Sequence, residues 1–180
     1  MGRGSRRDVP PPPPDEDDGP SDPESVARAI VLRSLTQRAR SRSELATLLR
    51  RRGIPDAVVR DVLDRFTDVG LVDDAALARG FADAAHAERG LSSRAVAGKL
   101  RQRGIDDELI RDAVSRIDPE SERAAALALA QKKARTLRGL DPVVQTRRLV
   151  SLLARRGYSP GLSYAVAREV IGDLEVEVDA

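Results

Sequence analysis

Cysteine and tryptophan are absent from this chain of 180 residues, and phenylalanine and tyrosine occur only twice each. Without cysteine, the chain has neither a disulfide framework nor a thiolate metal site. With so few aromatic side chains, any core has to be built from Leu, Val, Ile and Ala, which argues against a single bulky globular core. Long apolar runs are also absent, so we expect a cytoplasmic protein with no membrane contact.

Acidic residues are concentrated at the start of the chain. Residues 1–24 have a net charge of −4, whereas residues 25–180 have a net charge of +6. The first segment contains the runs PPPPP and DEDDG and has no apolar periodicity, so it cannot bury enough surface to offset the entropy lost on ordering. We therefore expect a disordered Pro-rich and acidic tail over residues 1–22 and a short acidic tail over residues 175–180. An alternative role for the first tail is to compete with nucleic acid for the basic remainder of the chain.

The rest of the sequence is typical of helices. Apolar residues recur at intervals of three and four, and closely spaced turn signals separate the runs. Ser21 with Glu24 and Ser41 with Glu44 fit the capping box, in which a hydroxyl and a carboxylate each accept from a backbone N–H group. Three further helix starts have a cap residue directly before proline: Asp118, Asp141 and Ser159. No alternating strand pattern is present, so the sequence predicts an all-α protein.

One pattern occurs three times along the chain. Its copies read LLRRRGIPDAVV (48–59), KLRQRGIDDELI (99–110) and LLARRGYSPGLS (152–163). When they are aligned on the glycine, apolar residues fall in register four and eight residues before it and five, nine and thirteen residues after it. This is an internal repeat, so each unit should contain a leading helix, a second helix that ends at the glycine and a third helix that follows.

The repeat predicts the organisation of the whole chain. We expect three-helix repeats over residues 23–71, 72–118 and 119–174, stacked into an elongated, curved and modular helical array. The second and third helices of each repeat are joined by a short glycine-containing turn, which gives the units a resemblance to helix-turn-helix motifs.

The repeated glycines, Gly53, Gly104 and Gly157, suit the left-handed conformation that closes a helix, and the apolar residue after each should pack against the preceding turn. An arginine directly before each glycine complements the negative end of the helix dipole. This structural role does not require the other basic residues around the turns, which could reach phosphates or acidic protein groups. The candidate contact residues for a partner or DNA are Arg50, Arg51, Arg101, Arg103, Arg155 and Arg156, with Lys132 and Lys133 in the third unit.

A second informative stretch, GLVDDAALARGFADAAHAERG, begins at Gly70. Gly70 should end one helix and Asp73 should cap the next, whose Leu77 and Phe81 share a face and are expected in the core. This stretch resembles the signature of the RecX family, regulators of the RecA recombinase, and the run RGLSSRAVAGKLRQRGI (89–105) is similar to the family's next segment. At position 77 the family commonly has Phe or Tyr. The signature residues that we expect to be mainly structural are Gly70, Asp73, Asp74, Phe81, Arg89 and Gly104.

The resemblance extends over roughly residues 25–172, and the family shows the same triplicated three-helix organisation. It implies a helical protein that lies along the groove of the RecA filament on DNA and mainly inhibits RecA, by suppressing ATP hydrolysis, strand exchange and co-protease activity. Such a regulator acts in recombination, DNA repair and the SOS response. The basic charge is consistent with an auxiliary, non-specific DNA contact. We expect an elongated monomer, because no apolar stripe remains to specify a dimer.

Enzymatic chemistry is not indicated by the sequence. The single histidine, His86, has no second ligand with which to share a metal. Asp73–Asp74 and Asp106–Asp107 are adjacent pairs at helix starts, where carboxylates stabilise the positive end of the dipole. The triplet Gly98–Leu100 lacks the other residues of a phosphate-binding loop. We therefore expect no enzyme, no cofactor and no metal.

Two other classes of binding protein are compatible with parts of the sequence. A direct, non-specific DNA-binding protein built on tandem helix-turn-helix-like units would explain the arginines, although proteins that bind single strands usually stack bases on aromatic residues, which are scarce here. A helical-repeat scaffold for an unrelated partner would explain the periodicity alone. The resemblance over residues 70–105 favours the recombinase regulator over both.

Overall fold

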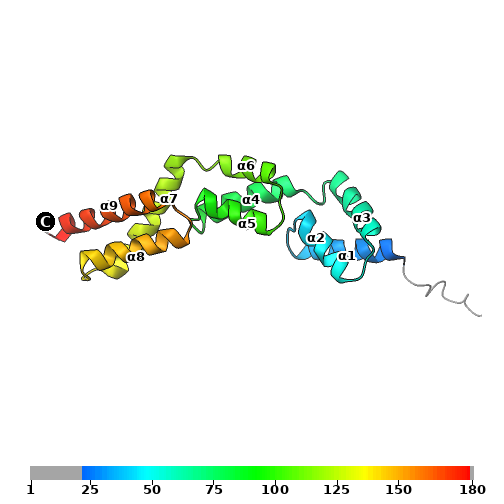
Figure 1. Cartoon of the computed structure of the whole chain (residues 1–180), viewed down its shortest axis with the longest axis horizontal. Coiled ribbons are helices and arrows are strands. Elements are labelled where there is room, and N and C mark those ends of the chain that lie inside the picture. Colours follow the sequence, from blue (N-terminus) through cyan, green and yellow to red (C-terminus); the bar gives the residue numbers. More distant parts are fainter. Residues whose placement is uncertain (1–21, 179–180) are drawn as a thin grey trace, which may run out of the picture.

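The computed structural model describes residues 22–178, and these are helical almost throughout (Figure 1). Within this range the chain forms nine α-helices, one 3₁₀ helix and no strand, which confirms the all-α prediction. The elements are α1 (Pro23–Gln37), α2 (Arg42–Arg51), α3 (Asp56–Asp68), α4 (Asp74–Ala87), α5 (Ser93–Gln102), α6 (Asp107–Ser115), α7 (Pro119–Ala134), η1 (Arg135–Leu137), α8 (Pro142–Arg155) and α9 (Pro160–Val178). The expected first tail, residues 1–22, lies outside the described range except for Asp22. Of the expected second tail, residues 175–180, the first four belong to α9, which ends at Val178, and the last two lie outside the described range.

The helices form three units in chain order, α1–α3, α4–α6 and α7–α9, which we refer to as units 1, 2 and 3. The helices of a unit pack chiefly on one another. Each unit has its own core, built mainly of Leu, Val, Ile and Ala, with Phe66 in unit 1 and Tyr158 in unit 3. Among residues 22–172 the buried hydrophobic residues form three separate clusters. Fully burying one such side chain contributes about 1.5–3 kcal/mol. The stability of the chain is therefore divided among three small cores, as the scarcity of aromatic residues predicted.

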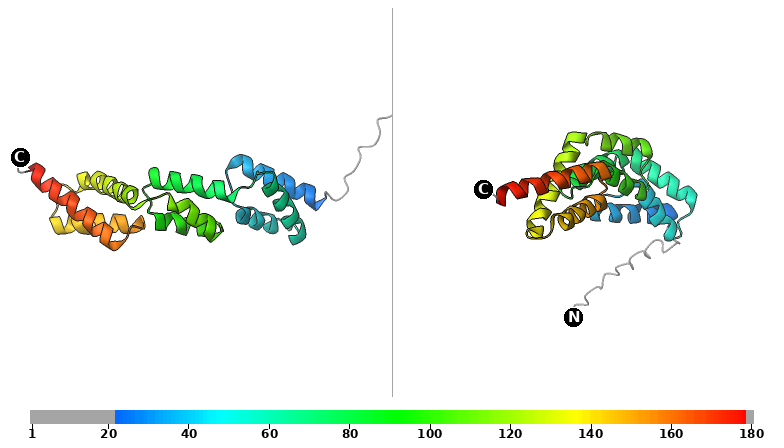
Figure 2. Two further views of the ribbon diagram at one scale, coloured as in Figure 1. Left: turned by 90° about the horizontal axis from the view of Figure 1, so that it is seen from above. Right: turned by 60° about the vertical axis from the view of Figure 1, so that its left-hand side comes forward.

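The three units follow one another along the long axis, so the described chain is an elongated arch (Figure 1). In that view α6 lies on the upper, convex side of the arch, and α8 lies on the lower side. Figure 2 shows the same linear order from above, with the first and last helices at opposite ends of the molecule. The predicted elongated, curved and modular array is confirmed.

Each second helix ends at its glycine in the predicted conformation. The φ angles of Gly53, Gly104 and Gly157 are +78°, +72° and +88°. The next N–H group donates to the carbonyl of the leucine four residues before the glycine, over 3.2 Å in all three units. This is the Schellman arrangement of a helix C-terminus. The apolar residues that follow the glycines are all buried: Ile54, Ile105 and Tyr158.

Burial follows the predicted register with two exceptions. Thirteen residues after the glycine, Phe66 and Val170 are buried as predicted, whereas Ile117 is only half-buried. The apolar residues four and eight positions before the glycine, and those nine positions after it, are fully or almost fully buried in every unit. Five residues after the glycine, however, the side chains are only half-buried, whereas those six residues after it are buried: Val59, Ile110 and Ser163. A helical face more than 100° wide includes both positions, and the sixth lies nearer its centre. The apolar pattern could not show this, because unit 3 has a serine there.

The helix starts carry most of the predicted caps. Ser41 and Glu44 form both hydrogen bonds of the capping box, and the two Asp-Pro starts cap α7 and α8 through their carboxylates. The cap of α1 differs from the prediction. Asp22, not Ser21, precedes the first helical residue and accepts from the N–H groups of Glu24 and Ser25, while Ser21 lies outside the described residues. Proline at the next position makes Asp22 equivalent to the other Asp-Pro starts.

Candidate partner-binding surface

Basic side chains surround each glycine turn and have local partners in two of the units. Arg50 Nε donates to Asp56 Oδ1 over 2.7 Å, and Arg101 Nε donates to Asp107 Oδ1 over the same distance. These pairs connect the second helix to the third across the turn. Unit 3 has Pro160 at the position of the two aspartates. All four charged side chains are more than half exposed, so each pair contributes only about 0–1 kcal/mol and remains accessible to a partner.

Units 1 and 2 are joined at the start of α2. Arg103 Nη2 donates to Glu44 Oε2 over 2.8 Å and to the Ala39 carbonyl over 3.0 Å. The Arg103 carbonyl accepts from the Ser41 hydroxyl over 2.6 Å. The Glu44 and Arg103 side chains are only 22% and 18% exposed, so this is the most buried ion pair among residues 22–178. Arg103, predicted as a contact residue, is thus engaged between units.

Two carboxylates at this junction have shifted pKa values. Burial raises the pKa of Glu44, but the hydrogen bonds from Arg103 and from the Ser41 N–H, with the positive charge nearby, outweigh it, so the pKa of Glu44 is lowered. Asp74 accepts from the Arg42 N–H over 2.9 Å. Burial is the largest influence on Asp74 and raises its pKa. Glu44 therefore stabilises the junction in its ionised form.

Units 2 and 3 are joined in a similar way. The Ser92 N–H donates to the Arg156 carbonyl over 3.0 Å, and the Arg156 guanidinium donates to the carbonyl of Arg89. The Tyr158 hydroxyl donates to the Gly90 carbonyl over 3.0 Å. Burial raises the pKa of Tyr158 to about 12. At both junctions, therefore, the arginine before the glycine of one unit contacts the start of the second helix of the preceding unit.

Two of the repeated glycines also permit close approach between units. A Cβ atom on Gly104 would lie 2.3 Å from Ser43 Oγ, and one on Gly157 would lie 2.6 Å from Ala95 Cβ. A Cβ atom on Gly53 would meet no atom within 4 Å, because no described unit precedes unit 1. The glycine of units 2 and 3 is thus needed for packing as well as for its backbone conformation.

The signature residues lie at or beside these junctions. Gly70 ends α3 with a φ of +73°, and Asp73 caps α4 by accepting from the Ala76 N–H over 2.8 Å, both as predicted. Asp74 and Gly104 contact unit 1, and the Arg89 carbonyl contacts unit 3. These positions are consistent with the mainly structural role expected of the signature.

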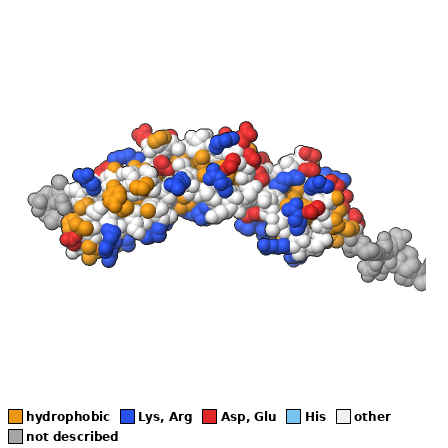
Figure 3. All heavy atoms as spheres, in the orientation of Figure 1, with side chains coloured by type: hydrophobic (Ala, Val, Ile, Leu, Met, Phe, Trp, Pro, Cys, Tyr) orange, Lys and Arg blue, Asp and Glu red, His pale blue; other side chains and the backbone are white. Residues whose placement is uncertain are grey.

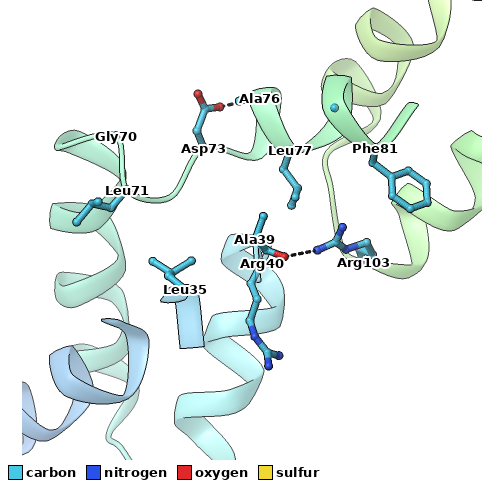
Figure 4. Close-up of a pocket in the computed structure, with 11 residues that line it drawn as sticks. Leu35, Ala39, Arg40, Gly70, Leu71, Asp73, Ala76, Leu77, Phe81 and Arg103 are labelled. Atoms are coloured by element: carbon cyan, nitrogen blue, oxygen red, sulfur yellow. Dashed lines mark hydrogen bonds between the residues drawn. The ribbon is translucent and has the colours of Figure 1, made fainter. Parts of the chain in front are cut away.

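An apolar hollow of about 460 Å³ lies between units 1 and 2 (Figure 4). Leu35 and Leu71 line it from unit 1, and Leu77 and Phe81 line it from unit 2. The Arg103 guanidinium lies 5.9 Å from the centre of the Phe81 ring. Leu77 and Phe81 were expected in the core, and this is corrected: they are half-buried at its margin. Their face of α4 is turned toward a neighbouring unit, while the fully buried face of α4 carries only alanines.

The lower edge of the arch is rich in basic side chains, and acidic side chains are more frequent on the upper edge (Figure 3). Among the predicted contact residues, Arg51, Lys132 and Lys133 are exposed and form no ion pair with any side chain in the range 22–172. Arg155 donates to the neutral Ser151 hydroxyl over 2.6 Å. These four cations are available to an external partner.

Sequence reasoning missed a second, basic hollow of about 430 Å³ on unit 1, between α1 and α2. Arg33, Arg40 and Arg52 line it together with Ser34. The repeat could have indicated this site. Arg52 aligns with the two arginines that each contact the preceding unit, but no described unit precedes unit 1. Arg33 and Arg40 lie outside the repeated segment, so alignment on the glycines did not draw attention to them.

The single histidine has a local structural role. His86 Nδ1 lies 2.9 Å from the Leu91 carbonyl oxygen at the end of α4, within hydrogen-bonding distance. Among the side chains of residues 22–172, no group of three or more His, Asp and Glu is placed to hold a metal ion. In the same range, no helix has both the length and the apolar character needed to cross a membrane.

Separate cores, short junctions and a charged outer edge together define a modular helical-repeat protein, a class that binds partners over an extended surface. The sequence matches three family models, described as the first, second and third three-helix domains of RecX, over residues 27–66, 73–114 and 120–166. The chain belongs to the RecX family.

Similar proteins support this assignment over most of the chain. Regulatory protein RecX of Thermobifida fusca (strain YX) is 49% identical over 160 residues, which cover 89% of this chain and 86% of that protein. Regulatory protein RecX of Streptomyces coelicolor is 45% identical over 152 residues, covering 84% and 81%. The crystal structure of RecX from Lactobacillus salivarius has the same fold, with a TM-score of 0.74 at 19% identity, and the similarity covers 83% of this chain and 97% of that one.

Proposed function

We propose that this protein regulates the RecA recombinase, mainly as an inhibitor. It lies along the groove of the RecA filament on DNA and suppresses ATP hydrolysis, strand exchange and co-protease activity in recombination, DNA repair and the SOS response. The observation that carries the proposal is an arch of three chained units, rich in basic side chains along one edge, in a chain of the RecX family. The regulator acts in the cytoplasm as a monomer and catalyses no reaction of its own.

The shape of the arch supports binding along a filament. A filament presents the same surface at regular intervals, and a chain of similar units can contact several protomers at once. Each contact after the first is intramolecular, so the total affinity exceeds that of any single unit. Because the contacts are charged and exposed, the affinity should also fall as salt is added.

The exposed cations are the proposed contact residues. Arg51, Arg155, Lys132 and Lys133 can bind acidic groups of a protomer without breaking an ion pair of this chain. Arg50 and Arg101 have exposed aspartate partners, and exchanging such a weak pair for one with the filament costs little. The effect on ATP hydrolysis is then exerted through RecA.

The decisive experiment is a titration of the cognate RecA, assembled on single-stranded DNA, with this protein. ATP hydrolysis is measured together with binding of the protein to the same DNA without RecA. We expect hydrolysis to fall at concentrations that leave bare DNA unoccupied. If hydrolysis falls only when bare DNA becomes coated, or does not fall, the proposal is wrong.

A second candidate function is direct, non-specific DNA binding through the tandem helix-turn-helix-like turns. The arginines that recur at successive turns favour it, since a row of basic groups could follow a phosphate backbone. This function predicts tight binding to DNA without RecA and a steep fall in affinity between about 50 and 200 mM salt. The bare-DNA arm of the titration, repeated over this range, separates the two functions.

A further inference from the structure

The basic hollow on unit 1 contains hydrogen-bond donors without acceptors. Arg33, Arg40 and Arg52 line it. Among the side chains of residues 22–172, no acidic one lines the hollow and none forms an ion pair with these three arginines. Arg40 Nε is buried and has no hydrogen-bond partner among the same residues. Ser34, which is only 5% exposed, also lines the hollow, and its hydroxyl has no partner either. Buried polar groups are normally satisfied, so this arrangement points to an anionic ligand.

The repeat shows what the corresponding surface of unit 2 binds. Arg52 and Ile30 of unit 1 align with Arg103 and Phe81 of unit 2. In unit 2 that arginine lies over the phenylalanine ring and is bound by unit 1, which supplies a carboxylate, Glu44, and a backbone carbonyl. Unit 3 uses its corresponding arginine in the same way, with a carbonyl of unit 2 as the acceptor.

Unit 1 therefore presents a copy of a surface that is covered in units 2 and 3, and none of residues 22–172 covers it. Arg52 is exposed and the space beside Gly53 is open, whereas Arg103 and Gly104 are packed against the start of α2. The group that fills this surface in unit 2 is the first turn of a helix with a serine cap and a glutamate three residues later. The uncovered surface has the shape and charge for the same kind of group from another molecule.

We infer that this face of unit 1 binds the acidic first turn of a helix on a partner protein, with a carboxylate held by Arg52 and Arg33. The planar fork of arginine matches a carboxylate or a phosphate equally well. The carboxylate is favoured because the aligned Arg103 binds one within this chain. This inference rests on the proposed function, in which the partner is a RecA protomer, and it assigns a specific contact to unit 1.

The test uses the full chain with Arg33→Ala and Arg52→Ala combined. The matched control is Arg60→Ala with Arg111→Ala, two exposed arginines at aligned positions of α3 and α6, which removes the same charge from another surface. Labelled protein is titrated with RecA filaments on single-stranded DNA at low salt, and separately with the bare DNA. We expect the hollow variant to bind filaments about tenfold or more weakly than the control does, while the two bind bare DNA equally.

Each outcome has a definite meaning. Filament binding equal to that of the control would overturn the inference and leave the proposed function intact. A selective loss of bare-DNA binding would show that the ligand is a phosphate, which would also overturn it. If the parent protein does not bind filaments, the proposed function fails and this inference fails with it. Arg52→Lys provides a second measure, because it keeps the charge but loses the fork and should bind filaments with intermediate affinity.

Discussion

At the scale of single residues, substitutions at the repeated glycines can separate two effects: the strain of a left-handed backbone and the collision of a side chain with the preceding unit. Gly53 and Gly157 both have φ above +70°, so a side chain at either position is strained. Only at Gly157 would a Cβ atom also collide with the preceding unit, 2.6 Å from Ala95 Cβ. We expect Gly53→Ala to lower the free energy of unfolding by about 1–2 kcal/mol, the cost of the left-handed conformation. Gly157→Ala should cost distinctly more, as measured by urea denaturation, and equal losses would contradict the packing role.

The core leucines can be tested in the same way. Leu49 is 0% exposed and stands four residues before the glycine of unit 1. Truncation leaves a cavity among the helices of one small unit, so we expect Leu49→Ala to lower the free energy of unfolding of that unit by about 2–5 kcal/mol. Leu71 is 53% exposed and provides the control, since Leu71→Ala should change stability by no more than about 0.5 kcal/mol. A Leu49→Ala protein that melts like the parent would show that the repeat register is wrong.

At the scale of helices, the sequence predicted those features that short stretches of sequence determine, namely where helices lie and how they begin and end. Periodicity, caps and the glycine turn act within about fifteen residues. The glycine turn was confirmed at the ends of α2, α5 and α8, and the predicted caps were confirmed for α2 and α8. The role of Arg103 was missed because its partner Glu44 lies 59 residues away, and no local pattern specifies that pairing. Leu77 and Phe81 were misplaced for the same reason: a helical apolar stripe does not reveal whether it faces its own core or a neighbouring unit.

The start of α8 differs from the starts of α2 and α5, which form the two junctions. The cap of α8, Asp141, stands sixteen residues before its glycine, whereas Ser41 and Ser92 stand twelve residues before theirs. α8 is therefore about one turn longer at its start. Gln145 occupies the position of the two serines and donates to the Leu140 carbonyl over 2.7 Å. Among the described residues, Arg52 of unit 1 is therefore exposed, and unit 3 has no serine cap that corresponds to Ser41 and Ser92.

The junction between units 1 and 2 should weaken in acid. The pKa of Glu44 is lower in the folded protein than its ordinary value of 4.5, so ionised Glu44 favours the folded state. This contribution is fully present above the unfolded pKa and is lost as the pH falls through the folded one. We expect Glu44→Gln to lower the free energy of unfolding by about 1–3 kcal/mol at pH 7, and the difference from the parent to shrink below pH 4.5.

Thermal melting of the parent and the variant between neutral and acidic pH checks this prediction. Glu88→Gln is the matched control, because Glu88 is exposed and forms no ion pair with a described residue. The control should have nearly the stability of the parent at every pH. If the stability difference between the parent and the Glu44→Gln variant stayed constant with pH, an electrostatic role of Glu44 at the junction would be contradicted.

At the scale of the whole molecule, three separate cores imply that the units do not unfold as one body. Adjacent units share a few hydrogen bonds and close glycine contacts, so the stability of the chain approximates a sum of unit and junction terms. We expect Leu153→Ala to reduce amide hydrogen-exchange protection mainly in unit 3, and Leu49→Ala to reduce it mainly in unit 1, because opening is local when few contacts cross the boundary. Mass spectrometry of peptides from each unit resolves the two patterns. If either variant lost protection equally in all three units, the arch would be one cooperative body, and the junctions would be stronger than their contacts indicate.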